Sequence, residues 1–257
     1  MSWLDPLRRS LDGAGQPRRF FLRDDDAGWN DERLFELLDT VAARGLAVDL
    51  AVIPAAANRR LASSLIARSE NADRPLGVHQ HGLGHVNHER SGRKCEFGSS
   101  RDRDAQRRDI ATGRRRLFEL FGEAVDPIFT PPWNRCSRDT CVCLVELGFA
   151  ALSRESRARP IDVPGLAELP VSVDWFARRK GVRLSASELG GLLAGATAGP
   201  GPVGVMFHHA VMDANERAAA GELLDLLASH PNAAVHPMRD LLRCAASGPS
   251  RRPALSA

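Results

Sequence analysis

Long hydrophobic runs are missing from this sequence, since no window approaches the roughly 18 apolar residues that a membrane-spanning helix needs. The first residues mix leucines with Asp5, Arg8 and Arg9, so they lack the continuous apolar stretch of a secretory signal. Cysteine is also scarce, and its five copies are an odd number, which argues against a disulfide framework. We therefore expect a cytoplasmic protein with reduced thiols and no membrane span.

Excess charge of either sign is absent as well. The formal net charge is only +3, too small to indicate a nucleic-acid partner. The densest basic run, Arg114–Arg116, falls in a helical pattern and is interpreted as a solvated helix face. With 257 residues, 43% of them hydrophobic, the chain has the length and composition of one large α/β domain or two small ones, and can bury a full core.

Short apolar runs alternate with stretches of helical periodicity along most of the chain. The predicted strands are Phe20–Arg23, Ala47–Ile53, Leu76–His81, Pro127–Thr130, Phe149–Ser153, Glu168–Val173, Val203–His208 and Ala233–His236. The predicted helices are Asp31–Ala43, Ala57–Arg68, Asp104–Phe121, Arg138–Leu147, Ala186–Leu193 and Ala214–Ala228. The strands lack clean alternation, as expected when both faces are buried, and the order of elements predicts a parallel sheet closed into a barrel.

This pattern divides the chain into three parts. Residues 1–17 are expected to form an N-terminal arm or helix, residues 18–245 the barrel, and the Ser-, Pro- and Arg-rich residues 246–257 a disordered tail. Within the barrel, Gly84–Arg103 is long, polar and without a clear period. A loop of that length in a compact domain is usually functional, so we place it on the substrate side.

Polar clusters stand where the predicted strands end. They are Asp24–Asp26, His79–His85, Thr130–Asn134, Asp174–Trp175 and His208–His209. The carboxyl ends of parallel barrel strands meet on one face of the fold, which is where the chemistry of such barrels lies. The clusters are therefore expected to form one site.

Two of these clusters indicate a metal ion. Asp24–Asp26 places three adjacent carboxylates that repel one another unless a cation neutralises them. His81 and His85 have the spacing H-x-x-x-H, which can bring two ring nitrogens to one metal, whereas His79 is better placed for a supporting role. Imidazole with carboxylate suits zinc first, with cobalt, nickel or iron as alternatives.

Taken in order, the clusters resemble the polysaccharide deacetylase superfamily, which comprises the NodB-homology domains and carbohydrate esterase family 4. The residues that carry the resemblance are Leu22–Asp26, His81–His85, Phe129–Asn134, Val173–Trp175 and Met206–His208, and together they span about residues 18–242. The resemblance implies a single distorted (β/α)7–8 barrel. It also implies a metal-dependent hydrolase that removes an acyl group, such as acetyl, from an N-acylated amino sugar or glycan.

The resemblance further implies roles for single residues. Asp25, His81 and His85 would hold one divalent metal ion, and Asp24 would be the catalytic base. An offset by one position, with Asp25 as the base and Asp26 as the ligand, remains open. Either arrangement leaves one carboxylate for the metal and one for the proton.

The remaining clusters supply an acid and a substrate surface. His208 ends an apolar strand and is expected to protonate the departing amine, with Asp174 orienting its ring. Substrate contacts are expected from Trp133, Asn134, Pro132, Trp175, His79 and His209. The partner is thus a small molecule or a glycan, and the oligomeric state is left open.

Thr130 departs from the family pattern, because it stands where the family has an arginine that tethers the base. Arg23 or Arg135 would have to supply that charge. The departure also leaves room for a barrel that binds a carbohydrate without turnover. A second rival is a different amidohydrolase class acting on a non-sugar amide, because His79 and His81 form the H-x-H pattern of two-metal sites.

Overall fold

A computed structural model describes residues 2–70, 76–179 and 181–246. The strands of its main sheet are β1 (Arg18–Ala27), β2 (Asp49–Val52), β3 (Gly77–His81), β4 (Val125–Thr130), β5 (Ala151–Leu152), β6 (Ala167–Glu168), β7 (Val171–Asp174), β10 (Val203–Phe207) and β11 (Ala233–Val235). A separate hairpin is formed by β8 (Arg178–Arg179) and β9 (Val182–Arg183). The α-helices are α1 (Asp5–Asp12), α2 (Asp31–Ala42), α3 (Arg59–Glu70), α4 (Arg103–Phe121), α5 (Arg138–Glu146), α6 (Ala186–Ala198), α7 (Ala214–Ser229) and α8 (Met238–Ala246).

The main sheet is parallel throughout and curls into a distorted barrel, as the sequence predicts. Its strand order is β6-β5-β4-β3-β2-β1-β10-β7, with β11 added to the first half of β1. One segment, from Ala167 to Asp174, serves both ends of this order, because β6 pairs with β5 and β7 pairs with β10. Pro170 lies between β6 and β7, and because proline has no backbone N–H it interrupts the ladder there. The predicted strand Glu168–Val173 is thus two strands that close the ring.

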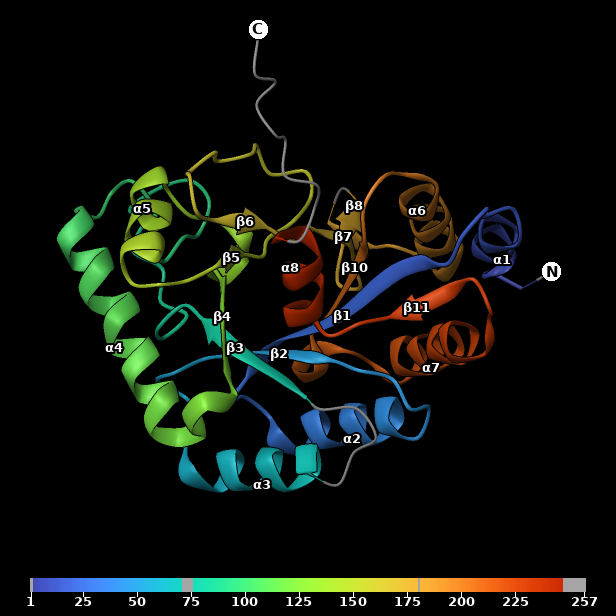
Figure 1. Ribbon diagram of the computed structural model, residues 1–257, viewed down its shortest axis with the longest axis horizontal. Coiled ribbons are helices and arrows are strands. Elements are labelled where there is room, and N and C mark those ends of the chain that lie inside the picture. The colour runs from blue at the N-terminus through green and yellow to red at the C-terminus, as the bar shows by residue number, and fades with distance from the viewer. Residues whose placement is uncertain (1, 71–75, 180, 247–257) are drawn as a thin grey trace, which may run out of the picture.

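The outer face of the sheet is apolar and is covered by a ring of helices (Figure 1). Phe20 and Leu22 of β1 point outward into the main core, where they meet the buried faces of α2 and α7. Side-chain caps define where these helices begin, with Asn30 accepting from the amide of Arg33 at α2 and Asp213 forming a capping box with Glu216 at α7. All the predicted helices are present, with bounds that differ by a few residues.

Two helices lie outside the six predicted ones, and only the second of them was unexpected. Helix α1 places Leu7 and Leu11 in the main core, so the segment expected as an N-terminal arm or helix is a helix packed into the barrel's shell. Helix α8 closes the amino ends of the strands, where Met238 and Leu241 pack inside the barrel against Phe21 of β1. The tail expected to be disordered begins inside α8, and its residues 247–257 lie outside the described part of the chain.

The inside of the barrel changes character along the strand direction. Near α8 it is mostly apolar, with Asp49 as a buried carboxylate, whereas at the carboxyl end it carries several buried polar and charged side chains, including Arg23, Asp25, His79, Thr130 and Ser153. Buried charge is costly unless it is paired, so this end of the barrel is the candidate functional site. Within residues 2–70, 76–179 and 181–246, no helix has the length and apolarity needed to cross a bilayer.

Candidate metal centre and active site

Three potential metal ligands converge at the carboxyl end of the barrel. They are Asp26 near the end of β1, His81 at the end of β3 and His85 in the following loop. Oδ1 of Asp26 lies 3.3 Å from Nε2 of His81 and 3.3 Å from Nε2 of His85, and the three donor atoms all lie within 4.8 Å of one another. One carboxylate and two imidazoles on a single point are the donor set of zinc and related divalent metals.

The donor atoms are oriented for a cation. Asp26 Oδ1 is buried and has no hydrogen-bond partner among the described residues, which is costly unless another species satisfies it. His81 Nδ1 lies 3.0 Å from the Thr130 carbonyl oxygen, which can only accept, so Nδ1 carries the proton and the lone pair of Nε2 faces Asp26. The residues present therefore fit a divalent metal ion.

The backbone at this centre is held in unusual conformations. Asp26 and His85 have positive φ values of 71° and 58°, and in the neighbouring loop Trp133 and Asn134 have values of 55° and 57°. Residues other than glycine adopt this left-handed region at a cost of about 1–3 kcal/mol each, and persist there only when surrounding contacts enforce it. The positive φ of Asp26 ends the strand alternation, so that its carboxylate reaches the histidines.

Glu96 supplies one of the enforcing contacts. Its side chain is buried, and its two carboxylate oxygens accept hydrogen bonds from the backbone amides of Leu83 (3.3 Å) and Gly84 (2.8 Å). A Cβ on Gly82 would lie only 2.2 Å from Glu96 Oε2, so glycine is required for this approach. The predicted substrate-side loop, Gly84–Arg103, thus contributes a residue that fixes the short turn between His81 and His85.

The positions of Asp24 and Asp25 do not fit the roles expected for them. Asp25 does not join the two histidines, because both of its carboxylate oxygens are bound by Arg23 from the same face of β1. Arg23 Nε lies 2.8 Å from Asp25 Oδ1, and Arg23 Nη2 lies 3.0 Å from Asp25 Oδ2. Asp26 takes the place of the third ligand, which is the offset that the sequence left open. Arg23, rather than Arg135, supplies the charge missing at Thr130, and Arg135 instead binds the carbonyl of Lys94.

Asp24 points to the opposite side of β1 and cannot serve as the base. Its Oδ1 accepts from the backbone amide of His209 at 3.0 Å, and its Oδ2 lies 2.6 Å from His209 Nδ1. The other ring nitrogen of His209 lies 2.6 Å from the Trp29 carbonyl. Burial opposes a charge on His209, but Asp24 outweighs it and raises the pKa of the imidazole to about 9. The pair is a buried structural ion pair, and His209 is not open to substrate.

Asp25 is a better candidate for the base. Burial opposes its ionisation, but Arg23, and then His81 and His208, hold its pKa below the usual carboxyl range. It is therefore ionised at neutral pH and able to accept a proton. Arg23 is itself fixed by Ser153 Oγ at 2.7 Å and Asn134 Oδ1 at 3.0 Å, so the expected substrate residue Asn134 instead positions the arginine.

His208 and Asp174 lie on the far side of the same mouth. His208 Nδ1 is 3.7 Å from Asp174 Oδ1, which is an ion-pair distance but too long for a hydrogen bond. Burial raises the pKa of Asp174, and His208 acts in the opposite direction. The two groups were expected to act together as acid and orienting carboxylate, and they are adjacent in the fold.

Three other expected substrate residues are buried. Trp175 is only 3% exposed, donates through Nε1 to the Glu216 carbonyl and packs into the main core. His79 is fully buried, and its Nε2 lies 2.9 Å from Thr130 Oγ1. Burial lowers the pKa of His79 to about 3, and Arg23 adds to this effect. Pro132 is buried, and its ring lies 2.7 Å from where a Cβ on Gly82 would be, so it packs against the histidine turn.

The burial of His79 counts against the two-metal interpretation of the H-x-H pattern. Among the described residues, the one group of histidine, cysteine and acidic side chains that can hold a metal is Asp26 with His81 and His85. The geometry therefore provides one metal position.

Aromatic side chains flank the centre. The ring of Trp133 lies edge-on to His85 with centroids 4.3 Å apart, and Trp29 lies on another side of His85 at 4.9 Å. Trp133 was expected from the sequence, whereas Trp29 was missed. Trp29 is 41% exposed, which is unusual for so large an apolar side chain, and its position at the close of the turn that begins at Asp26 was the available signal.

The chain thus forms a parallel α/β barrel with a group of two histidines and one carboxylate that could hold a metal at the carboxyl ends of its strands. No protein-family model matches the chain, and no curated protein sequence matches it significantly. Solved structures do match over nearly its whole length, and they give that architecture a name: the chain has the fold of the polysaccharide deacetylases of carbohydrate esterase family 4.

Three of these structures illustrate the likeness. A Mycobacterium smegmatis protein provisionally described as a polysaccharide deacetylase has a TM-score of 0.67 at 16% identity, over 90% of this chain and 91% of its own. A family 4 pseudoenzyme from Bacillus anthracis has a TM-score of 0.60 at 13% identity, over 89% and 66%. A family 4 acetyl xylan esterase from Clostridium thermocellum, in complex with a cobalt ion, has a TM-score of 0.57 at 11% identity, over 88% and 91%. At these identities the likeness defines the fold.

Proposed function

We propose that this protein is a metal-dependent deacylase that hydrolyses the amide of an N-acylated amino sugar, free or within a glycan. The observation that carries the proposal is the position of Asp26 Oδ1, which is buried, lacks a hydrogen-bond partner among the described residues and lies 3.3 Å from a ring nitrogen of both His81 and His85. The fold supports it, because structures named as deacetylases and esterases share it.

Asp26, His81 and His85 would hold one divalent ion, for which zinc is the first candidate and cobalt is supported by the Clostridium structure. Such an ion acts as a Lewis acid on the amide carbonyl and makes water acidic enough to ionise near neutral pH.

Two proton transfers are then assigned to side chains of the protein. Asp25, ionised and held by Arg23, accepts the proton from the attacking water. His208, with Asp174 beside it, donates a proton to the departing nitrogen, so that the C–N bond breaks with the amine leaving neutral. Trp133 and Trp29 form walls beside His85 that suit the apolar face of a sugar ring or the acyl methyl.

A barrel that binds a carbohydrate without turnover is the main alternative, because the fold is shared with a pseudoenzyme and with a variant of it in which activity was restored. The Arg23–Asp25 pair favours catalysis. Two buried charges are expensive to maintain, and this pair places a charged carboxylate beside the metal position without making it a ligand.

The test is acetate release from N-acetylglucosamine oligomers by protein loaded with zinc or cobalt, together with its metal content. We expect Asp25→Asn to keep the metal and lose turnover, and His208→Ala to keep the metal while turnover falls by about 10²–10⁴-fold. Asp26→Ala should lose the metal. A wild-type protein that binds one metal but releases no acetate from any N-acetylated sugar would favour the non-catalytic alternative, and full activity in Asp25→Asn would remove our assignment of the base.

A further inference from the structure

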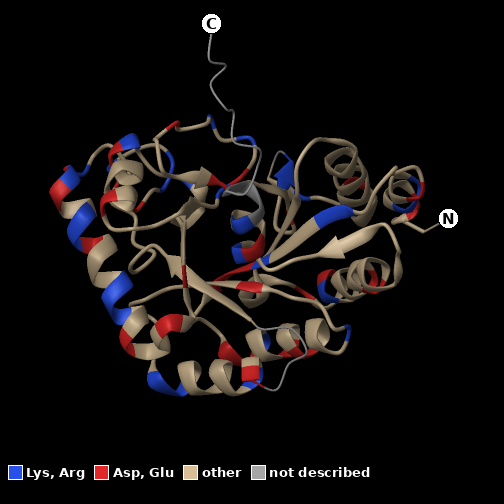
Figure 2. Ribbon diagram, viewed as in Figure 1, with Lys and Arg blue, Asp and Glu red and all other residues tan. Residues whose placement is uncertain are grey.

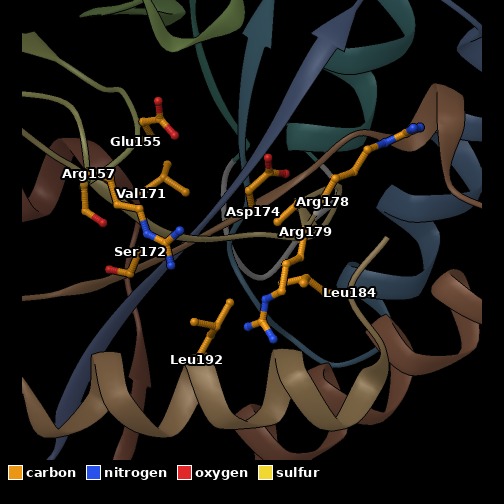
Figure 3. A pocket seen from close by; sticks show the side chains of 11 residues that line it. Glu155, Arg157, Val171, Ser172, Asp174, Arg178, Arg179, Leu184 and Leu192 are labelled. Atoms are coloured by element: carbon orange, nitrogen blue, oxygen red, sulfur yellow. The ribbon is translucent and has the colours of Figure 1, made fainter. Parts of the chain in front are cut away.

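A pocket of about 270 Å³ opens beside Asp174 (Figure 3). It is bounded by the segment after β5 (Glu155–Arg157), by β7, by the β8–β9 hairpin and by Leu192 of α6. Asp174 is common to the pocket and to the proposed acid, because its Oδ1 lies 3.7 Å from His208 Nδ1. The pocket therefore begins where the proposed leaving group would depart.

The pocket is lined by three arginines and two carboxylates. Arg157 and Arg179 extend their guanidinium groups into the space between β7 and α6, whereas Arg178 points away from it (Figure 3). Arg157 makes no hydrogen bond or ion pair with any residue that the structure describes, and Arg179 is paired with Glu188 at 2.8 Å. Of the two carboxylates, Asp174 already faces His208. Glu155 also lines the pocket but forms no ion pair with Arg157, so Arg157 is a cation directed into the cavity without an ion-pair partner among the described residues.

Positive charge also continues from the pocket to the proposed acid. The guanidinium groups of Arg183 and Arg178 lie over the ring of Phe176, at 4.1 Å and 4.9 Å from its centroid. The centroid of the same ring lies 5.7 Å from that of the His208 ring. The β8–β9 hairpin that supplies these arginines is visible as a basic element next to β7 in Figure 2. Arg183 is also paired with Glu216, so the positive charge next to the acid end of the site comes mainly from Arg178.

We propose that this pocket binds an anionic group of the substrate, a carboxylate or a phosphate, carried by the amino sugar itself or by the unit next to it. The proposal rests on the proposed function for the location of the scissile amide. Arginine forks match the oxygens of carboxylates and phosphates, whereas a neutral sugar gives a guanidinium no counter-charge. A volume of about 270 Å³ is near the lower end for ligand pockets, so it suits one substituent or one sugar ring.

The first test is equilibrium binding by titration calorimetry. The probes are N-acetylglucosamine, N-acetylglucosamine 1-phosphate and N-acetylmuramic acid, which are neutral, phosphorylated and carboxylated amino sugars. We expect at least one anionic probe to bind about tenfold or more tightly than the neutral one. That preference should be lost in Arg157→Ala, reduced in Arg179→Ala and weakened by added salt. The anionic probe that binds more tightly shows whether the pocket prefers a phosphate or a carboxylate.

Two controls keep the result specific. Arg115→Ala removes the same charge from the exposed face of α4, away from the pocket, and should keep the preference. Protein stripped of metal should also keep it, because a preference that disappears with the metal would place the anion on the metal instead. Equal binding of the three probes, binding of none, or a preference unchanged in Arg157→Ala would each overturn the proposal.

Acetate release from the same three compounds separates this proposal from the proposed function. An anion preference in binding that depends on Arg157, without acetate from any probe, would contradict the proposed hydrolysis and leave the anionic pocket standing. Equal turnover of neutral and anionic probes, with no effect of Arg157→Ala, would leave the hydrolysis standing and overturn the anionic pocket.

Discussion

Arg23 donates hydrogen bonds to both carboxylate oxygens of Asp25, from Nε at 2.8 Å and from Nη2 at 3.0 Å. The Arg23 side chain is 0% exposed and the Asp25 side chain 3%. The two residues are neighbours on one face of β1, because side chains two positions apart in a strand point the same way. The family resemblance implies an arginine at the place of Thr130 instead. In this protein the arginine that pairs with Asp25 is Arg23, which lies on the same strand as Asp25.

This relationship predicts that lysine cannot replace Arg23, because a single ammonium cannot donate in parallel to both oxygens of Asp25. For Arg23→Lys we expect turnover to fall about 10- to 100-fold with metal content unchanged. Arg23→Met should also lower the free energy of unfolding by about 3–5 kcal/mol, since it leaves a buried carboxylate unpaired. Steady-state kinetics and urea unfolding would measure both, with Arg115→Lys as the control. Wild-type turnover in Arg23→Lys would show that the pair does not position the base.

Asp24 and Asp26 should give opposite results when each is changed to asparagine. Asp26→Asn removes a charged ligand and is expected to lower metal occupancy strongly, with little loss of stability. Asp24→Asn should keep the metal but lower the free energy of unfolding by about 3–5 kcal/mol, because His209 would lose its buried counter-charge. Elemental analysis and urea unfolding would separate the two. Loss of metal from Asp24→Asn with Asp26→Asn fully loaded would reverse the assignment.

Glu96 is expected to act on the metal through the turn that it holds. Glu96→Ala removes the acceptors for the amides of Leu83 and Gly84, so we expect metal affinity to fall about 10- to 100-fold. Glu96→Gln keeps one acceptor oxygen and should lie between the alanine variant and the wild type. Competition with a chromogenic chelator would measure the affinities, and Glu119→Ala on the exposed side of α4 is a matched control. Unchanged affinity in Glu96→Ala would mean that the turn holds its shape without this carboxylate.

The amino end of the barrel predicts a pH-dependent stability. Burial raises the pKa of Asp49 to about 7, well above the ordinary value near 4, although the amide of Met238 at the start of α8 donates to its Oδ2 at 3.0 Å. The folded state therefore takes up a proton that the unfolded chain has lost between about pH 4 and pH 7. Stability from this group is fully present below about pH 4 and is lost as the pH rises through about 7.

Asp49→Asn should remove that dependence. We expect the variant to be more stable than the wild type at pH 8, by up to about 4 kcal/mol, with a smaller difference at pH 5. Urea unfolding at both pH values would measure it, and Asp162→Asn on the surface should show no such change. A difference between variant and wild type that is the same at both pH values would contradict a raised pKa at Asp49.

The sequence predicted the barrel and the meeting of His81 and His85 at one end of it, because both follow from local patterns. Strands such as Val203–Phe207 are uninterrupted apolar runs, and polar clusters at their ends are visible without coordinates. The choice between Asp25 and Asp26 was not predictable, because it depends on the left-handed backbone at Asp26, which breaks the two-residue alternation. Burial was equally hidden, since nothing local distinguishes the core residue Trp175 from the exposed Trp29.

Helices α1 and α8 differ in how clearly the sequence indicates them. Helix α1 carries Pro6 in its first turn, and Leu7 and Leu11 lie one turn apart on its buried side, so its signal was present. Helix α8 follows Pro237 and is only nine residues long. Its existence depends on the barrel interior that Met238 and Leu241 fill, which no short stretch of sequence reveals.

Of the five residues other than glycine with positive φ in the described chain, four stand at the candidate active site: Asp26, His85, Trp133 and Asn134. Directed evolution for heat resistance alone would favour glycine or a relaxed backbone at just these places, since each change would release conformational strain. The variants so obtained would have a higher melting temperature, but their metal ligands and aromatic side chains would no longer be held in one orientation. A selection that couples heat challenge to turnover would be needed to keep both properties.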